Sequence, residues 1–135
     1  RLRATAEKIE HPPSYAIALT YIAMAQAFAG DNDGAMKTAA DMENDALRNK
    51  AFNESAEIQA ERGNITAAFE SITAIDSPAF RDKAYHTISK IFTERGEYDK
   101  ALDAAQKIDN DYQKAQGILH ILAKQISPEE IAISK

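Results

Sequence analysis

The chain contains no cysteine and no tryptophan, and it has only five glycines and four prolines among its 135 residues. Without cysteine it can form neither a disulfide bond nor a cysteine-ligated zinc site. Runs of β-branched residues, which favour strands, are also scarce. About a fifth of the residues are alanine, the strongest helix former. This composition predicts one all-α domain spanning residues 1–135.

Two kinds of partner are disfavoured by what the chain lacks. No apolar run reaches the length of about 18 residues that a membrane-spanning helix needs, so we expect no membrane insertion. The most apolar stretch, from Ala16 to Ala29, is shorter and contains polar residues, which indicates a buried helix. The net charge is −5, and phosphate binding needs clustered lysine and arginine, so we expect no nucleic acid partner. These absences leave the compartment unknown and slightly favour a soluble, cytoplasmic protein.

Signatures of catalysis are missing as well. There is no phosphate-binding glycine loop, no Gly-x-Ser-x-Gly and no cysteine nucleophile, so we expect no enzymatic activity. His86, His120 and Glu57 could supply three zinc ligands if they met, but no His-Glu-x-x-His motif supports such a site. We therefore expect no metal and no cofactor.

Three glycines mark an internal repeat, because Gly30, Gly63 and Gly96 each lie 33 residues from the next. The residues at fixed distances from these glycines also match. The matching sets are Ala18, Ala51 and Ala84 before the glycine, and Ala35, Ala68, Ala101, Met42, Ile75 and Ile108 after it. Their spacing follows one side of a helix, so each set predicts a buried stripe. Each glycine is expected to end a helix with a positive φ angle.

The frame divides the chain into units of residues 1–11, 12–44, 45–77, 78–110 and 111–135. A full unit reads as a first helix of about 16 residues, a glycine turn and a second helix of about 12 residues. Residues 1–11 read as a second helix only, and residues 111–125 as the first helix of a terminal unit. We therefore expect about three full repeats with partial ends, forming a segment of a longer array.

Helix boundaries are indicated by capping residues. Ser77 followed by Pro78 predicts a helix start, as do the weaker signals Asn44 and Asn110. The stretch Ser127-Pro128-Glu129-Glu130 contains a capping box. His11-Pro12-Pro13-Ser14 is expected to break the helix before Tyr15.

Arginines and aromatic residues also follow the frame. We expect Arg48 and Arg81 to form salt bridges between units, with Asp45 and Asp82 as partners. Arg62 and Arg95, each preceding a turn glycine, suit the negative end of a helix dipole. Most aromatic residues fall at positions expected in the core: Phe52, Phe69, Phe80, Tyr85, Phe92 and Tyr98.

The third unit resembles a tetratricopeptide repeat. Its turn reads Gly96-Glu97-Tyr98-Asp99-Lys100-Ala101-Leu102, and the family's first-helix positions are filled by Tyr85, Ile88, Ser89 and Phe92. The chain resembles a divergent member, since its period is 33 residues and the other two turns lack the tyrosine. The resemblance implies a right-handed superhelix of antiparallel helix pairs, whose first helices line a concave face that holds a peptide or a partner protein.

That resemblance also implies the residues of the binding face. The predicted ligand-binding residues are Lys50, Asn53, Glu57, Lys83, His86, Lys90 and His120. Further residues at the same positions are Ile17, Thr20, Met24, Glu54, Thr87, Gln116, Leu119 and Ala123. The lysine and asparagine donors would suit a carboxylate or an acidic peptide. The alternative interpretation is that these lysines are solvated charges on an exposed helix face.

The leading functional prediction is thus a protein-interaction scaffold. Two alternatives remain open at this stage. One is a structural segment that self-associates through its terminal repeats, and the other is the helical accessory domain of an enzyme.

Overall fold

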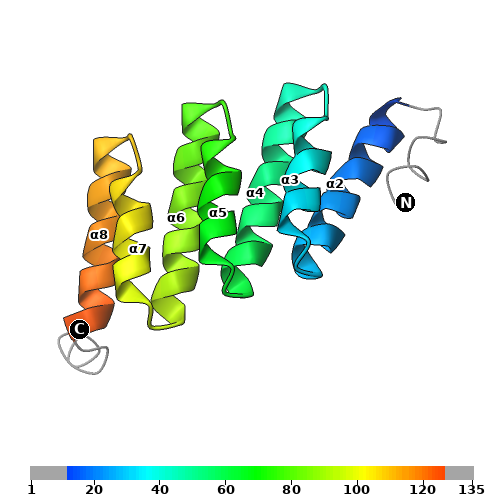
Figure 1. Ribbon diagram of the computed structural model, residues 1–135. Coiled ribbons are helices and arrows are strands. Elements are labelled where there is room, and N and C mark those ends of the chain that lie inside the picture. Colours follow the sequence, from blue (N-terminus) through cyan, green and yellow to red (C-terminus); the bar gives the residue numbers. More distant parts are fainter. Residues whose placement is uncertain (1–11, 127–135) are drawn as a thin grey trace.

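The computed structural model describes residues 12–126, and that part of the chain consists of helices and contains no strand. This confirms the predicted all-α class. The helices, shown in Figure 1, are α2 (Pro12–Phe28), α3 (Asn32–Ala40), α4 (Asp45–Glu61), α5 (Ile65–Thr73), α6 (Pro78–Glu94), α7 (Tyr98–Gln106) and α8 (Asp111–Ile126). The predictions for residues 1–11 and for the capping box at Ser127 lie outside the described residues.

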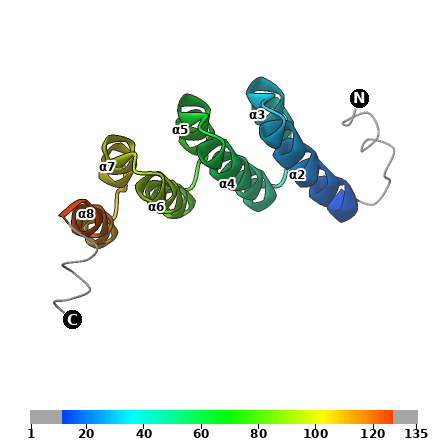
Figure 2. The same cartoon turned by 90° about the horizontal axis from the view of Figure 1, so that it is seen from below.

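The helices are arranged in two layers that run along the molecule in chain order. Figure 2 shows α2, α4, α6 and α8 in one layer and α3, α5 and α7 in the other. Each first helix packs against the next first helix and against the second helix of its own unit. Successive helices run in opposite directions (Figure 1), so each unit is an antiparallel pair. Every first helix in the layer therefore points the same way and presents the same face.

The three turn glycines adopt the predicted left-handed backbone. Their φ angles are 89° at Gly30, 82° at Gly63 and 76° at Gly96. In each turn the residue after the glycine donates its N–H to a carbonyl five residues back, as Asn64 does to Gln59 at 2.7 Å. This bond satisfies a carbonyl that the helix end would otherwise leave unpaired. The same turn geometry in all three units explains why the glycines recur every 33 residues.

Two predicted boundaries need correction. The second helices α3, α5 and α7 have nine residues each, which is shorter than expected. The first helix begins earlier than expected, because α2 starts at Pro12 and not at Tyr15. Proline is tolerated in the first turn of a helix, where its missing N–H has no partner to lose. The starts at Asn44 and Ser77 are confirmed, since each side chain accepts a backbone N–H of the first turn.

The core between the layers is built from alanine and isoleucine at matching repeat positions. Ala35, Ala68 and Ala101 in the second helices are fully buried, as are Ile75 and Ile108 at the unit ends. Small side chains let the helix backbones approach closely, and the isoleucines fill the space between pairs. The stripes predicted from the frame thus form the core of the described residues.

Two units also bury a polar pair between their two helices. Thr38 donates a hydrogen bond to Gln26, and Ser71 donates one to Gln59, in each case at 2.7 Å. In the third unit the same two positions carry Phe92 and Ala104, both fully buried. In the third unit, a large and a small apolar residue therefore take the place of the hydrogen-bonded pair found in the first two units.

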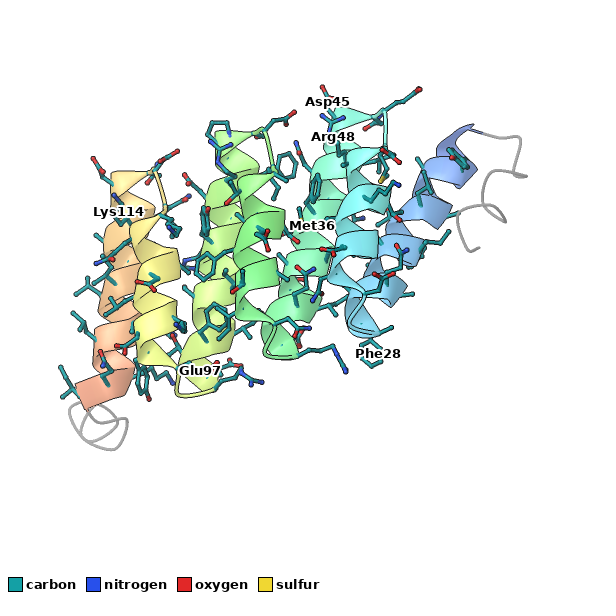
Figure 3. The ribbon with its side chains drawn as sticks, in the orientation of Figure 1. Phe28, Met36, Asp45, Arg48, Glu97 and Lys114 are labelled. Atoms are coloured by element: carbon teal, nitrogen blue, oxygen red, sulfur yellow. The ribbon has the colours of Figure 1, made fainter. Side chains whose placement is uncertain are left out.

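Contacts between units are made by arginines, in part with partners other than those expected. Arg48 and Arg81 each donate Nη1 to a backbone carbonyl of the preceding unit, at Met42 (3.0 Å) and Ile75 (2.6 Å). Arg48 also pairs with Asp45, the expected partner, and with Asp76. Both carboxylates belong to the same unit as Arg48, so the expectation of a salt bridge between units is wrong here. Figure 3 shows Asp45 and Arg48 together at one end of α4.

Asp82 does not form the expected salt bridge with Arg81. Instead its two carboxylate oxygens accept the backbone N–H groups of Asp109 and Asn110, at 2.8 and 3.1 Å. Asp82 is buried, and this position on α6 faces the connection that leads into α8. Two charge-assisted hydrogen bonds compensate a carboxylate that no arginine neutralises.

The arginines before the turn glycines reach back to the preceding unit at the other end of the layer. Arg95 donates Nη1 to the carbonyl of Glu61 at 2.9 Å, which matches the expected role at a helix C-terminus. Arg62 lies 4.6 Å above the ring of Phe28, which is at the end of α2 (Figure 3). Both arginines contact a residue 34 positions earlier, so this contact also repeats.

The aromatic residues divide between core and surface. Phe52, Tyr85 and Phe92 are buried as expected, and Phe69 and Tyr98 are partly buried against the core. The expectation for Phe80 is wrong, because its side chain is exposed. Phe80 lies in the first turn of α6.

Candidate functional site: the outer face of the first helices

The candidate site is the face of α2, α4, α6 and α8 that points away from the second helices. The predicted binding residues occupy α4, α6 and α8 at repeat-related positions of this face. Lys50, Lys83, Lys90 and His120 are exposed, whereas Asn53, Glu57 and His86 are half-buried. Because the four first helices are parallel, residues 33 apart form rows that cross the layer.

The face of α4 is dominated by carboxylates. Glu54, Glu57 and Glu61 lie on one side of the helix, at the spacing that brings side chains together. Burial raises the pKa of Glu57, and the neighbouring charges of Glu54 and Glu61 raise it further. The charge of Lys83 on the adjacent α6 lowers the pKa of Glu57, so Lys83 lies near Glu57. We call Glu54, Glu57 and Glu61 the acidic stripe.

The face of α6 carries positive charge from Lys83 to Lys90, and Glu94, at the repeat position of Glu61, follows one turn later. Lys83 and Lys90 form no ion pair with any residue of the described range 12–126. His86 lies between them, and burial lowers its pKa, with further contributions from Lys90 and from His120 on α8. We call Lys83, His86 and Lys90 the basic stripe.

Two buried polar atoms on this face are unpaired. Asn53 Oδ1 and His86 Nδ1 are shielded from solvent, and neither has a hydrogen-bond partner among the described residues. The two residues occupy the same repeat position on α4 and α6. A Cβ placed on Gly117 of α8 would lie 3.8 Å from His86 Nδ1, so this nitrogen is directed into the packing between α6 and α8.

An apolar hollow lies between α2 and α4. It has a volume of about 330 Å³ and is lined by Ile17, Thr20, Tyr21, Met24 and Leu47, with Lys50 and Glu54 at its edge. Ile17 and Tyr21 are 51% and 66% exposed, which is unusual for large apolar side chains. Ile17, Thr20 and Met24 were expected on this face. Tyr21 and Leu47 were not, because the frame alone does not show which neighbours lean into a gap.

A second hollow was missed by the sequence analysis. It lies on the opposite side, among α3, α5 and α7, and has a volume of about 830 Å³. Its floor includes Met36, labelled in Figure 3, together with Ile65 and Phe69, and Lys107 lies 5.7 Å from the Phe69 ring. Its charges, Glu70, Asp103, Lys100 and Lys107, are balanced and mixed. Ile65 and Phe69 lie four residues apart on α5, and this pair of apolar residues was the sequence signal that could have indicated the hollow.

Metal ligands do not gather on this face. Across residues 12–126, no group of three or more histidine, cysteine, aspartate or glutamate side chains is placed to hold a metal ion. Similarly, none of the helices that the structure describes is long and apolar enough to cross a membrane. The chemistry available on the face is therefore hydrogen bonding, charge pairing and apolar contact.

Comparisons with known proteins add no assignment: no family model, curated protein or solved structure matches the chain.

Proposed function

We propose that this chain is a divergent tetratricopeptide-like repeat scaffold, in which the helix pairs wind into a right-handed superhelix and the first helices bind a peptide or partner protein. The observation that carries the proposal is the chemistry of the outer face. Parallel helices present lysines that form no ion pair within residues 12–126, beside the acidic stripe and an apolar hollow. A bound chain with complementary charges would pair these groups.

The repeat geometry also supports binding over catalysis. A catalytic site needs groups that converge in a pocket. Here the rows are spread along a layer of helices, an arrangement that suits many weak contacts to an extended partner. We therefore propose no enzymatic role for this segment, and the accessory-domain alternative would apply to a larger protein that uses the same binding face.

The test is selection of peptides from a random displayed library on the purified protein, followed by affinity measurement. Lys83→Glu with Lys90→Glu should weaken binding of the selected peptides by about tenfold or more, because close charge pairs are lost and repulsion replaces them. The matched control is Lys100→Glu with Lys107→Glu, which makes the same change in the hollow on the opposite side. Loss of binding in the control variant alone would place the site among the second helices and contradict the proposal.

A second candidate function, self-association, is favoured by one observation. The end helix α8 exposes Leu119, Leu122 and Ile126, which are 65%, 41% and 72% accessible. Such a patch is typical of a surface that stacks on another unit. Analytical ultracentrifugation of the wild type and of Leu122→Glu tests this candidate. A concentration-dependent dimer that the substitution abolishes would support it, and a monomer at all concentrations would reject it.

A further inference from the structure

The outer face changes its chemistry from one first helix to the next. The α2 side offers the apolar hollow with Ile17, Tyr21 and Met24, α4 carries the acidic stripe, and α6 carries the basic stripe. The packing order α2, α4, α6 fixes the order of these three zones across the layer. A ligand that crosses the helices meets them one after another.

We infer that the ligand of this face is an extended peptide whose side chains present an apolar, then a basic, then an acidic residue in that order. The inference rests on the proposed binding function and names its partner. Neighbouring helix axes are about 8–10 Å apart, and an extended chain in the polyproline II conformation advances about 3.1 Å per residue with about three residues per turn, so side chains three residues apart lie on one side of it. The three side chains are therefore spaced by about three residues.

Each zone requires its own kind of side chain. The hollow of about 330 Å³ has room for one large apolar side chain, whose burial would cover Ile17 and Tyr21. The acidic stripe concentrates three carboxylates, and Glu57 is half-buried among them, so a cation from the ligand would relieve both repulsion and burial.

The basic stripe requires an anion. Lys83 and Lys90 have no ion-pair partner in the described residues. They lie about 10 Å apart along α6, so a ligand carboxylate at the level of Lys90 would pair with that lysine. Met24, Glu57 and Lys90 occupy one repeat position on α2, α4 and α6, so a straight chain perpendicular to the helices can reach all three zones.

The opposite order of charges would be rejected. A basic residue placed on the basic stripe and an acidic residue on the acidic stripe would each face like charges, which costs binding energy and provides specificity. The face thus selects peptides by the order of their charges and not by their total charge.

The experiment uses the peptides selected from the displayed library and a matched set in which only the basic and acidic residues exchange places. Wild-type protein should prefer the original order by about tenfold or more. The charge-exchanged variant Glu54→Lys, Glu57→Lys, Lys83→Glu, Lys90→Glu, which keeps the net charge, should prefer the exchanged order instead. Glu70→Lys with Lys100→Glu on the opposite side keeps the net charge as well and should leave the preference unchanged.

The outcomes separate this inference from the proposed function. Peptides that bind the first-helix face without any order preference, or a preference that the charge-exchanged variant retains, would overturn the inference and leave the binding function standing. Failure of every library peptide to bind, or binding insensitive to Lys83 and Lys90, would overturn the function itself. If thermal melting shows that the fourfold variant is unfolded, Glu57→Lys with Lys90→Glu tests the same reversal at a single repeat position.

Discussion

The carboxylate of Asp82 accepts a 2.8 Å hydrogen bond from the backbone N–H of Asp109, 27 residues further along the chain. Its other oxygen accepts the N–H of Asn110. This buried side chain on α6 therefore holds the connection from α7 into α8. It ties the third unit to the terminal one through the backbone of the connection between them.

Asp82→Ala should lower the free energy of unfolding by about 2–3 kcal/mol, because two hydrogen bonds to a charged acceptor are lost. Asp82→Asn keeps one acceptor oxygen and should cost clearly less. Urea denaturation followed by circular dichroism measures both. Equal losses for the two variants would show that the hydrogen bond retained by asparagine contributes nothing.

Two glycine-to-alanine substitutions should have effects of opposite sign. Gly30 has a φ of 89° and open space around it, so Gly30→Ala should destabilise through backbone strain alone, by about 1–2 kcal/mol. Gly117 is inside helix α8, and an added Cβ would meet Ala105 at an ordinary 3.4 Å. Gly117→Ala should therefore stabilise by about 0.5–1 kcal/mol, since alanine is the better helix former.

The same denaturation curves give both values for the glycine variants. Alanine already occupies the positions equivalent to Gly117 in the other units, at Ala18, Ala51 and Ala84. A loss of stability in Gly117→Ala would mean that α8 packs more tightly on α6 and α7 than the structure shows.

The hydrogen bond between Ser71 and Gln59 should reveal itself as an energetic coupling. Ser71→Ala leaves the buried Gln59 Oε1 without its donor, which should cost about 1–3 kcal/mol. In the background of Gln59→Phe the same change copies the Phe92 and Ala104 pair of the third unit and should be nearly neutral. A double-mutant cycle measures the difference, and additive effects would show that the two positions do not interact.

The pKa of His86 should be lowered in the folded protein, and this should make the free energy of unfolding depend on pH. Burial, Lys90 and His120 lower its pKa below the ordinary 6.5, so the unfolded chain binds a proton in a pH range where the folded protein does not. The contribution of His86 to stability is therefore complete above pH 6.5 and is lost as the pH falls through the folded pKa.

Two measurements check this shift. NMR titration should give a pKa for His86 below 6.5, and Lys90→Gln should raise it part of the way back, because burial remains the largest cause. His86→Gln should flatten the pH dependence of the unfolding free energy between pH 5 and 7, relative to wild type. A His86 pKa at or above 6.5 would contradict the burial that the structure assigns to this ring.

Much of the architecture was predictable because its causes are local. The turn glycines, the caps at Asn44 and Ser77, and the buried alanine stripes depend on backbone conformation and on helical spacing within one unit. Two incorrect predictions had different causes. The start of α2 at Pro12 has a local cause that was misjudged, and the exposure of Phe80 depends on how neighbouring helices pack.

The candidate site was predictable only as a set of positions. The repeat places Lys50, Asn53, Glu57, Lys83, His86, Lys90 and His120 on α4, α6 and α8, but it does not say which of these groups lack partners. That property depends on distances between helices. The unpaired atoms of Asn53 and His86, and the hollow completed by Leu47, emerge only when α2, α4 and α6 are placed side by side.

The sequence by itself determined the helical class, the 33-residue frame and the positions of the turns, because glycine conformation and helical periodicity act over a few neighbouring residues. Only the tertiary structure decided that Asp82 binds backbone N–H groups instead of Arg81, and that the acidic and basic stripes lie on adjacent helices beside an apolar hollow. Those relationships join residues about 27 to 33 positions apart, and their partners are set by the direction in which each side chain leaves its helix.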